Sequence, residues 1–301
     1  MKIRPDIQKI IRSVLVFLIC LTLTPELYLS ARPYHYQSIP LWKEKGHGKA
    51  KVSLSAYIPK DGNDAKKAVI ICPGGSYFWL DKENEGEKMA ENLCRKGIAA
   101  FVLTYRVAGG FNFVTDFRFL YGGNVFPAML EDARCAISEV RGNAASYGIN
   151  PKAVGIMGFS AGGHLAMLTA EMKSEHTPDF VAAIYPVVTM SDKKCVHRRS
   201  RRGIMGTRAG DRQLQNLLSM EKNVPHDCCP VFLLSCEDDK VVDCRNAVLL
   251  DSALTERRAP HKYISLPCGG HGFGVKTVGK GADSFDWTAS FADWTVSLYG
   301  Y

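Results

Sequence analysis

The amino-acid sequence predicts an α/β fold, in which a mostly parallel central sheet is covered by helices on both faces. Short apolar runs alternate along the chain with stretches of helical periodicity, the pattern of buried parallel strands joined by crossover helices. A glycine-rich pentapeptide, residues 158–162, lies between one such run and a helical pattern. The chain has 301 residues, enough for one large domain of this kind with a buried core.

The first strands and the first helix are predicted from their periodicity. Residues 32–49 are polar and predict an irregular segment, and 51–58 alternate apolar and polar side chains, which predicts an edge strand. Continuous apolar runs at 68–72 and 98–105 predict buried strands. The helical pattern of 83–96 lies between them, so these residues predict a strand–helix–strand unit.

The rest of the chain continues this alternation. We expect strands at 153–158, 180–185, 231–236 and 263–266, and helices at 127–147, directly after 162, at 246–258 and around an apolar stripe of Trp287, Phe291, Trp294 and Leu298. Residues 186–228 carry few apolar runs and many charges, so we expect this insertion to form a lid or cap over the site. The whole of 32–301 is therefore predicted as one α/β domain.

The composition is that of an ordinary globular protein. Apolar residues make up 46% of the chain and charged residues 23%, and the formal net charge of +8 is mild. One dense basic run, Lys193–Arg202, is typical of a solvated loop. A nucleic-acid site would need interleaved aromatic residues and a recognised binding motif. The sequence has neither, so we expect no nucleic-acid partner.

The first 31 residues have the organisation of a signal peptide. Basic residues at positions 2–12 precede an apolar core at 14–23, which is too short to span a bilayer comfortably. The sequence therefore predicts an exported protein, periplasmic or secreted, with no stable membrane span once residues 1–31 are removed. An uncleaved anchor is an alternative, and so is a lipoprotein modified at Cys20, although bulky residues precede that cysteine.

The ten cysteines do not predict a metal centre. Cys72 and Cys236 fall in apolar strand-like runs and predict small core residues. There is no C-x-x-C pair, and the adjacent Cys228 and Cys229 do not have the spacing of metal ligands. We therefore expect no metal and no cofactor, and the sequence does not indicate how any disulfides would pair.

Ser160 is the predicted nucleophile. A strand-like run leads into Gly158-Phe-Ser-Ala-Gly162 and a helical pattern follows at once, which is the context of a G-x-S-x-G nucleophile elbow. The two glycines allow strand and helix to pack closely, and N–H groups at the helix start can stabilise negative charge beside the serine. The alternative is an ordinary glycine-rich turn.

A serine hydroxyl is a weak nucleophile at neutral pH and needs a base, for which His271 is the candidate. It lies in a glycine-rich loop just after the last predicted strand, at the edge where open α/β sheets place their sites. His164 is predicted to pack beneath the elbow, and His197 in the insertion is a candidate for substrate contact. Surface positions are predicted for His35, His47, His176, His226 and His261.

The base in turn needs an acid that fixes its tautomer and stabilises the imidazolium. Several carboxylates follow the predicted strand that ends at Cys236. We prefer Asp239, and Asp238 and Asp243 remain alternatives. The chain order of serine, aspartate and histidine is then that of α/β-hydrolases.

A tetrahedral intermediate also needs N–H donors for its oxyanion. One predicted donor is the backbone N–H of Ala161, the residue after the nucleophile. Gly75 and Ser76, in the loop Pro73–Tyr77, are the other candidates, because that loop follows a predicted buried strand. One such donor stabilises a transition state by about 3 kcal/mol. The alternative is a plain Pro-Gly turn.

These segments resemble those of bacterial α/β-hydrolases of the esterase/lipase group, in particular the acetyl-esterase and acetylxylan-esterase-like proteins. The matching segments are Pro73–Tyr77 (oxyanion loop), Leu103–Arg106, Asp132, Gly158–Leu165 (elbow), Asp238–Val242 (acid loop) and Gly269–Phe273 (histidine loop). The likeness covers roughly residues 50–298. Two positions depart from the pattern: Pro73 stands where histidine is common, and Asp243 where proline usually follows the acid loop.

The resemblance implies hydrolysis of short-chain carboxylic esters through an acyl-enzyme, with acetylated xylan as a candidate substrate. Aromatic residues at 77–79 and 111–119 predict a wall that favours acetyl over longer acyl groups. One alternative is a serine peptidase of the prolyl-oligopeptidase kind, for which a long propeller domain is missing. Another is a catalytically silent binding protein, which would be expected to have lost one of Ser160, Asp239 and His271.

Overall fold

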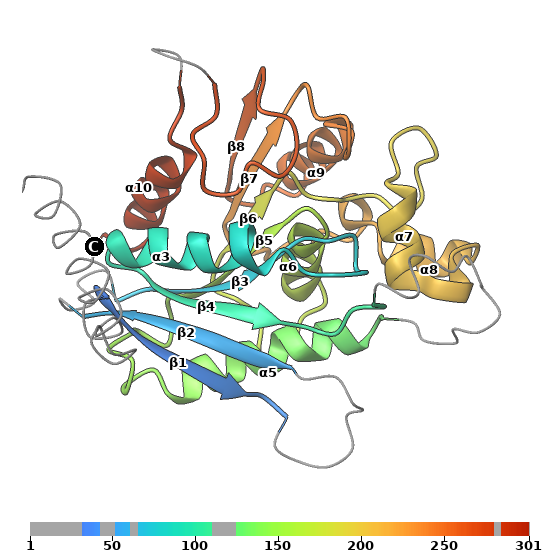
Figure 1. Ribbon diagram of the computed structural model, residues 1–301. Helices are drawn as coiled ribbons and strands as arrows, with labels where there is room; N and C mark the ends of the chain where they lie inside the picture. Colours follow the sequence, from blue (N-terminus) through green and yellow to red (C-terminus); the bar gives the residue numbers. More distant parts are fainter. Residues whose placement is uncertain (1–31, 43–51, 61–65, 110–124, 280–283, 301) are drawn as a thin grey trace, which may run out of the picture.

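The computed structural model describes residues 32–42, 52–60, 66–109, 125–279 and 284–300, which form a sheet with helices on both faces (Figure 1). The predicted signal peptide and the aromatic residues 111–119 lie outside the described residues. Within those ranges, no helix combines the length and the apolar character needed to cross a bilayer.

The sheet has eight strands in the order β1-β2-β4-β3-β5-β6-β7-β8. Their bounds are β1 (Tyr34–Pro40), β2 (Ser53–Pro59), β3 (Ala68–Cys72), β4 (Ala99–Thr104), β5 (Val154–Phe159), β6 (Val181–Ile184), β7 (Val231–Cys236) and β8 (His261–Leu266). All neighbouring pairs from β4 to β8 are parallel, whereas β1–β2 and β2–β4 are antiparallel. This mostly parallel sheet confirms the predicted α/β-hydrolase fold.

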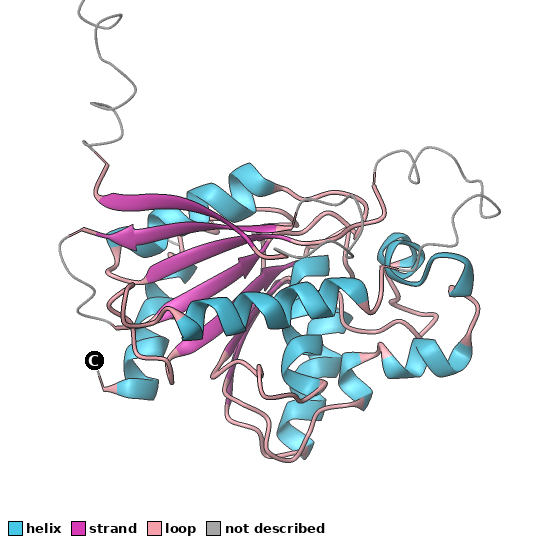
Figure 2. Ribbon diagram, turned by 90° about the horizontal axis from the view of Figure 1, so that it is seen from below, coloured by secondary structure: helices cyan, strands magenta, loops and turns pink. Residues whose placement is uncertain are grey.

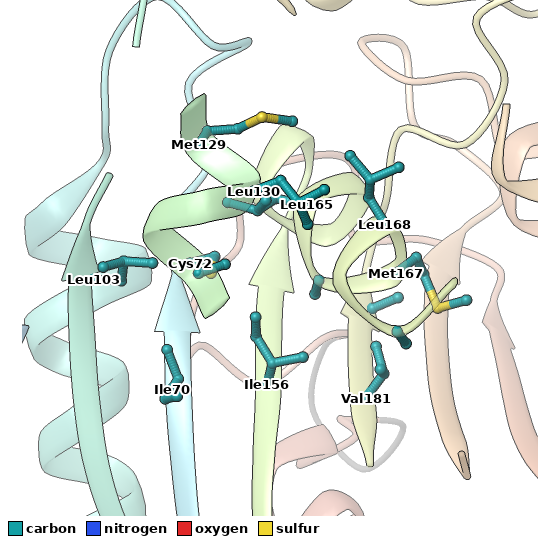
Figure 3. Packing of buried hydrophobic residues seen from close by; sticks show 14 of the residues in the cluster. Ile70, Cys72, Leu103, Met129, Leu130, Ile156, Leu165, Met167, Leu168 and Val181 are labelled. Carbon is teal, nitrogen blue, oxygen red and sulfur yellow. The ribbon is translucent and has the colours of Figure 1, made fainter. Parts of the chain in front are cut away.

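Helices cover both faces of the sheet (Figure 2). The π-helical η1 (Lys82–Glu87) runs into α3 (Lys88–Arg95), and with α10 (Trp287–Tyr299) it packs on one face, while α5 (Ala128–Gly142), α6 (Ala161–Glu171) and α9 (Arg245–Glu256) pack on the other. Alternate strand residues enter the two cores. Ile70 and Cys72 of β3 belong to the core beneath α5 and α6 (Figure 3), and Val69 and Ile71 belong to the core beneath α3 and α10.

The N-terminal edge differs from the expectation. Part of the segment predicted as irregular, Tyr34–Pro40, forms β1, which pairs along the full length of β2. β2 is therefore an inner strand, and its prediction as an edge strand was wrong. The cause lies in the pattern: only Tyr34 and Ile39 of β1 are buried, and they enter opposite cores, so no period-2 alternation exists.

The insertion between β6 and β7 is partly helical. It contains α7 (Arg198–Met205), η2 (Gly206–Arg208), α8 (Arg212–Leu217) and η3 (Met220–Lys222). A few apolar side chains attach these short helices to the core; they are Ile204, Met205, Leu214, Leu218 and Met220. With so few apolar residues among many charges, the sequence did not predict the helices. The role of this insertion as a lid or cap remains a prediction.

The insertion lies at one end of the strands, and the start of β1 and the end of α10 lie at the other. The carboxyl ends of the parallel strands point toward α7 and α8 in Figure 1, and the start of β1 and the end of α10 lie together on the far side. Figure 2 shows the same separation from another direction. The carboxyl edge, where open α/β sheets bind their ligands, is therefore away from the start of β1 and the end of α10.

Candidate active site

Ser160 stands on a tight turn between β5 and α6. Its backbone φ is +53°, a strained value for a residue with a side chain. A Cβ on Gly158 would lie 1.9 Å from the carbonyl oxygen of Gly162, and one on Gly162 would lie 2.0 Å from that of Cys72. Glycine is required at both positions because strand, turn and helix pack this closely.

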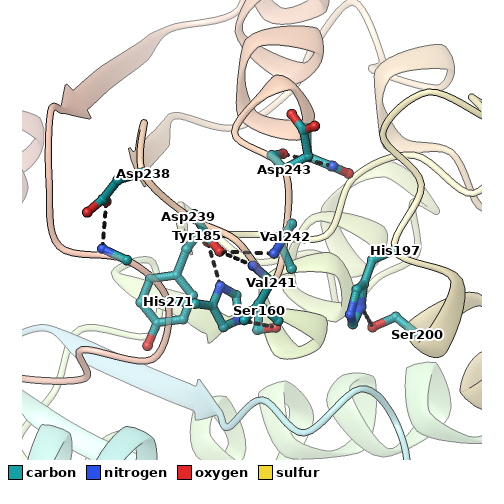
Figure 4. Close-up of polar contacts among 12 residues, drawn as sticks. Ser160, Tyr185, His197, Ser200, Asp238, Asp239, Val241, Val242, Asp243 and His271 are labelled. Carbon is teal, nitrogen blue, oxygen red and sulfur yellow. Dashed lines mark hydrogen bonds and ion pairs between the residues drawn. The ribbon is translucent and has the colours of Figure 1, made fainter.

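The structure brings Ser160, His271 and Asp239 together at the carboxyl edge of the sheet (Figure 4). The Oγ of Ser160 lies 2.9 Å from Nε2 of His271, and Nδ1 of the same imidazole lies 2.6 Å from Oδ2 of Asp239. A carboxylate at Nδ1 favours the tautomer with the proton there, which leaves Nε2 to accept the serine hydroxyl. The second oxygen of Asp239 accepts the N–H groups of Val241 at 2.8 Å and Val242 at 3.0 Å.

The two alternative acids have other partners. Asp238 accepts the N–H of Gly270 at 2.7 Å, and this bond lowers the pKa of its exposed carboxyl. Asp243 forms an ion pair with Arg245, with 2.6 Å between Oδ2 and Nη2. Of the three candidates, only Asp239 contacts His271, while Asp238 holds the loop that carries the histidine.

The loop Pro73–Tyr77 lies directly against the nucleophile. A Cβ on Gly74 would come within 3.1 Å of the Cβ of Ser160. Gly75 has a φ of +135° and Ser76 one of +56°, and both turn the backbone sharply after β3. Within the described part of the chain, the N–H groups of Gly75, Ser76 and Ala161 donate no hydrogen bond, so all three remain available to an oxyanion.

Glu85, which sequence reasoning missed, joins the oxyanion loop to the histidine loop. Its carboxylate accepts the N–H of Gly74 at 2.6 Å and the hydroxyl of Tyr185 at 2.8 Å. The same hydroxyl accepts the N–H of Gly274 at 3.3 Å, and the ring of Tyr185 lies 4.7 Å from that of His271. Burial raises the pKa of Glu85, against the opposing effect of its two hydrogen bonds.

Nothing in the sequence distinguishes Glu85 from its neighbours. It belongs to the charged run Lys82–Glu87, whose other acids, Glu83 and Glu87, are exposed. A buried acid in a polar helix start is revealed only when the chain folds and other loops donate hydrogen bonds to it.

Two further histidines, His164 and His197, lie close to the site. His164 is fully buried between the hydroxyl of Tyr77, at 2.7 Å, and the carbonyl oxygen of Leu218, at 2.8 Å. Burial lowers its pKa to about 4, so it is a neutral packing group under the elbow. His197 contacts Ser200 at 2.8 Å, and burial, with a smaller contribution from the nearby His271, lowers its pKa to about 4.

The aromatic residues after Ser76 divide between interior and surface. Tyr77 is completely buried and its hydroxyl contacts His164, so this ring packs beneath the loop and does not line a substrate pocket. Phe78 is also buried, whereas Trp79 is 41% exposed. Tyr77, which was expected to form part of the aromatic wall beside Ser160, is therefore a core residue.

Comparisons with known proteins add a family and several relatives. The family model BD-FAE matches residues 54–254, a range that includes Ser160 and Asp239 and ends before His271. The chain is 33% identical over 236 residues to endo-1,4-beta-xylanase B of Butyrivibrio fibrisolvens, covering 74% of this chain and 35% of that protein. It is 31% identical over 231 residues to an acetylxylan esterase of Xylanibacter ruminicola, covering 75% of this chain and 45% of that protein.

One of the solved structures that resemble this chain has a similar fold over most of its length. The acetyl ester-xyloside bifunctional hydrolase from Caldicellulosiruptor lactoaceticus has a TM-score of 0.72 and 28% identity, covering 87% of this chain and 96% of that one. The two sequence relatives are longer: this chain spans between about a third and a half of their length.

Proposed function

The chain belongs to the BD-FAE family, and from this membership we propose that it hydrolyses carboxylic esters, above all acetyl esters of plant polysaccharides. One observation carries the proposal: Ser160, His271 and Asp239 are linked by two hydrogen bonds, and three nearby backbone N–H groups donate to no acceptor among the described residues. A nucleophile, its base and an oxyanion site are the three parts that acyl transfer needs.

The proposed reaction begins with attack of Ser160 Oγ on the ester carbonyl carbon. His271 Nε2 takes the hydroxyl proton as the new C–O bond forms, and the carboxylate of Asp239 stabilises the resulting imidazolium. The carbonyl oxygen becomes an oxyanion, which the N–H groups near Ser160 stabilise. The imidazolium then returns its proton to the leaving alcohol oxygen, which departs and leaves an acyl-serine.

Deacylation repeats these steps with water as the nucleophile. His271 takes a proton from water as the oxygen attacks the acyl carbon, and a second oxyanion forms at the same N–H groups. Collapse of this intermediate breaks the bond to Ser160 and returns the proton to its Oγ. The products are a carboxylic acid and the regenerated serine.

An acetylated xylan as substrate is supported by what the relatives are. One is an acetylxylan esterase, another a xylanase, and the solved neighbour is a bifunctional hydrolase of acetyl esters and xylosides. Each name belongs to that protein, and the two sequence relatives extend well beyond the matched part. The proposal for this chain is confined to the ester-hydrolysing step.

The test compares several substrates with the wild-type protein and a Ser160→Ala variant. We expect the wild type to release nitrophenol from p-nitrophenyl acetate faster than from octanoate, and acetate from acetylated xylan. The variant should lose these activities, since the residual rate without a nucleophile is smaller by about a factor of a million. A maximal rate on aminoacyl-nitroanilides, or full activity of the variant, would contradict the proposal.

Export is proposed alongside this activity, because basic residues precede the short apolar core in the first 31 residues. Fractionation of the native cells, with N-terminal sequencing of the protein, tests it. We expect a mature N-terminus near residue 31 outside the cytosol. A cytosolic protein that still begins at Met1 or Lys2 would contradict export.

A further inference from the structure

The insertion carries a concentration of positive charge that the proposed reaction does not use. Between residues 193 and 210 the chain has seven basic residues and no acidic one, against a formal net charge of +8 for the whole protein. One acid lies on each side of this stretch: Asp192, which accepts the N–H of Lys194, and Asp211, which caps α8. We call residues 193–208 the basic segment.

Most of these side chains face solvent. The exposed members are Lys193, Lys194, Arg198, Arg199 and Arg208. The other two help to fix α7: Arg201 donates to the carbonyl oxygen of Met190 at 3.3 Å, and the guanidinium of Arg202 lies 5.1 Å from the centre of the Phe78 ring. Side chains of the same charge repel one another when they are held close together. A fixed backbone that holds several cations at the surface is therefore consistent with an anionic ligand.

The basic segment lies beside the reacting groups. A Cβ on Gly203 of α7 would lie 2.3 Å from the carbonyl oxygen of Ser76, so this helix packs directly on the oxyanion loop. His197, the residue before α7, is close enough for His271 and Asp239 to influence its pKa, and Figure 4 shows it with Ser200 on the α7 side of the site. Part of the basic segment, Gly203 and His197, therefore lies close to the position of a substrate bound at Ser160.

We propose that the basic segment binds carboxylate groups carried by the polysaccharide, so that the preferred substrate is an acetylated xylan with uronic acid side groups. This inference rests on the proposed esterase function. Guanidinium groups pair with carboxylates through two parallel hydrogen bonds, and a one-signed field beside the site raises the local concentration of an anionic polymer. Neutral acetylated xylan would gain neither effect.

The test uses acetylated xylo-oligosaccharides of equal length and acetyl content, with and without one uronic acid side group. We expect the wild type to show a kcat/KM about three- to tenfold higher for the acidic oligosaccharide, as expected for one or two exposed ion pairs. The ratio should fall toward one in 0.5 M NaCl, where such pairs are screened. Activity on neutral p-nitrophenyl acetate should not depend on the salt.

A pair of charge-matched variants locates the effect. Lys193→Gln with Arg198→Gln should bring the acidic-to-neutral ratio toward one while leaving p-nitrophenyl acetate hydrolysis unchanged. Arg95→Gln with Lys152→Gln removes the same charge at exposed positions at the end of α3 and before β5, and should keep the wild-type ratio.

The outcomes separate this inference from the function on which it rests. A wild-type ratio of one, with both oligosaccharides deacetylated, overturns the inference and keeps the esterase. If the variant with Lys193→Gln and Arg198→Gln still prefers the acidic oligosaccharide, the inference is also overturned. It is overturned too if the wild type binds vesicles of anionic phospholipid and does not distinguish the two oligosaccharides. If neither oligosaccharide is deacetylated, the proposed function fails and the inference fails with it.

Discussion

At the scale of single residues, the site depends on carboxylates whose roles are set by their partners. Asp239 holds His271, Asp238 holds the backbone of the histidine loop, and Asp243 is paired with Arg245. These three aspartates lie within six residues of each other, yet a substitution at each would remove a different interaction.

The first prediction compares two of these aspartates. Asp239→Asn should lower kcat on p-nitrophenyl acetate by about ten-thousandfold, because an amide that donates to Nδ1 favours the wrong tautomer of His271. Asp243→Asn removes an exposed ion pair and should stay close to wild type. Steady-state rates of the two variants show which aspartate acts with His271. Equal losses would mean that the acid has been assigned incorrectly.

The second prediction concerns Glu85. Glu85→Ala leaves the N–H of Gly74 without its acceptor and frees the hydroxyl of Tyr185, so both loops lose a fixed position. We expect kcat to fall at least about tenfold with little change in KM, since the oxyanion donors act in the transition state. Glu83→Ala, at an exposed position in the same helix, is the control. A KM effect alone would argue for a role in substrate binding.

The sequence indicated the candidate catalytic residues more directly than the residues that position them. Ser160 is marked by glycines that the close packing requires, and His271 by a glycine-rich loop after a strand, so a local pattern was enough to propose both. For the acid, the pattern left three neighbours open, and only the contact with His271 distinguishes Asp239. Glu85 and Tyr185 act through contacts 100 residues apart, which no local pattern contains.

At the scale of elements, strands buried on both faces were the most predictable part. β3, β5 and β7 consist almost entirely of apolar residues and glycine, and every residue in them is buried in the sheet. β1 was not predicted because its two buried residues enter different cores. α7 was not predicted because four of its eight residues are arginine. Elements held by few contacts leave little trace in the apolar pattern.

The third prediction belongs to α6. Near the end of this helix Glu171 is buried, and neither of its carboxyl oxygens has a hydrogen-bond partner within the described residues. Burial, with contributions from Cys228 and Glu221, raises its pKa well above the usual value. The native state therefore holds a proton that the unfolded chain releases, so this group destabilises the fold as the pH rises above about 4.3.

Glu171→Gln should thus be more stable than wild type at pH 8, with a difference that shrinks toward pH 4. Urea unfolding at both pH values measures it, and Glu175→Gln, at an exposed position, is the control. A variant that is less stable at pH 8 would indicate that the carboxylate is charged and stabilised in the fold.

At the scale of the whole molecule, Asp132 connects distant parts of the chain. It is completely buried on α5 and lies 2.8 Å from a guanidinium nitrogen of Arg106, which follows β4. It also accepts the indole N–H of Trp42, which follows β1, at 2.8 Å. The two strands at one side of the sheet are thereby joined to the helix beneath them.

The fourth prediction follows from this junction. Asp132→Asn leaves the guanidinium of Arg106 without its buried partner and should destabilise the fold by about 3 kcal/mol. Glu131→Gln, which removes only the exposed partner of the same arginine, should cost far less. Urea unfolding gives both values. If Asp132→Asn folds as stably as wild type but hydrolyses no ester, the residue acts in the reaction and not in the fold.

The placement of the two ends of the domain has a consequence for how such a unit can be joined to others. β1 begins and α10 ends on the side of the sheet away from α7 and α8. A second module joined directly to the start of β1 or the end of α10 would lie on the side of the sheet away from Ser160. Attachment at these points would require no change in the residues around Ser160.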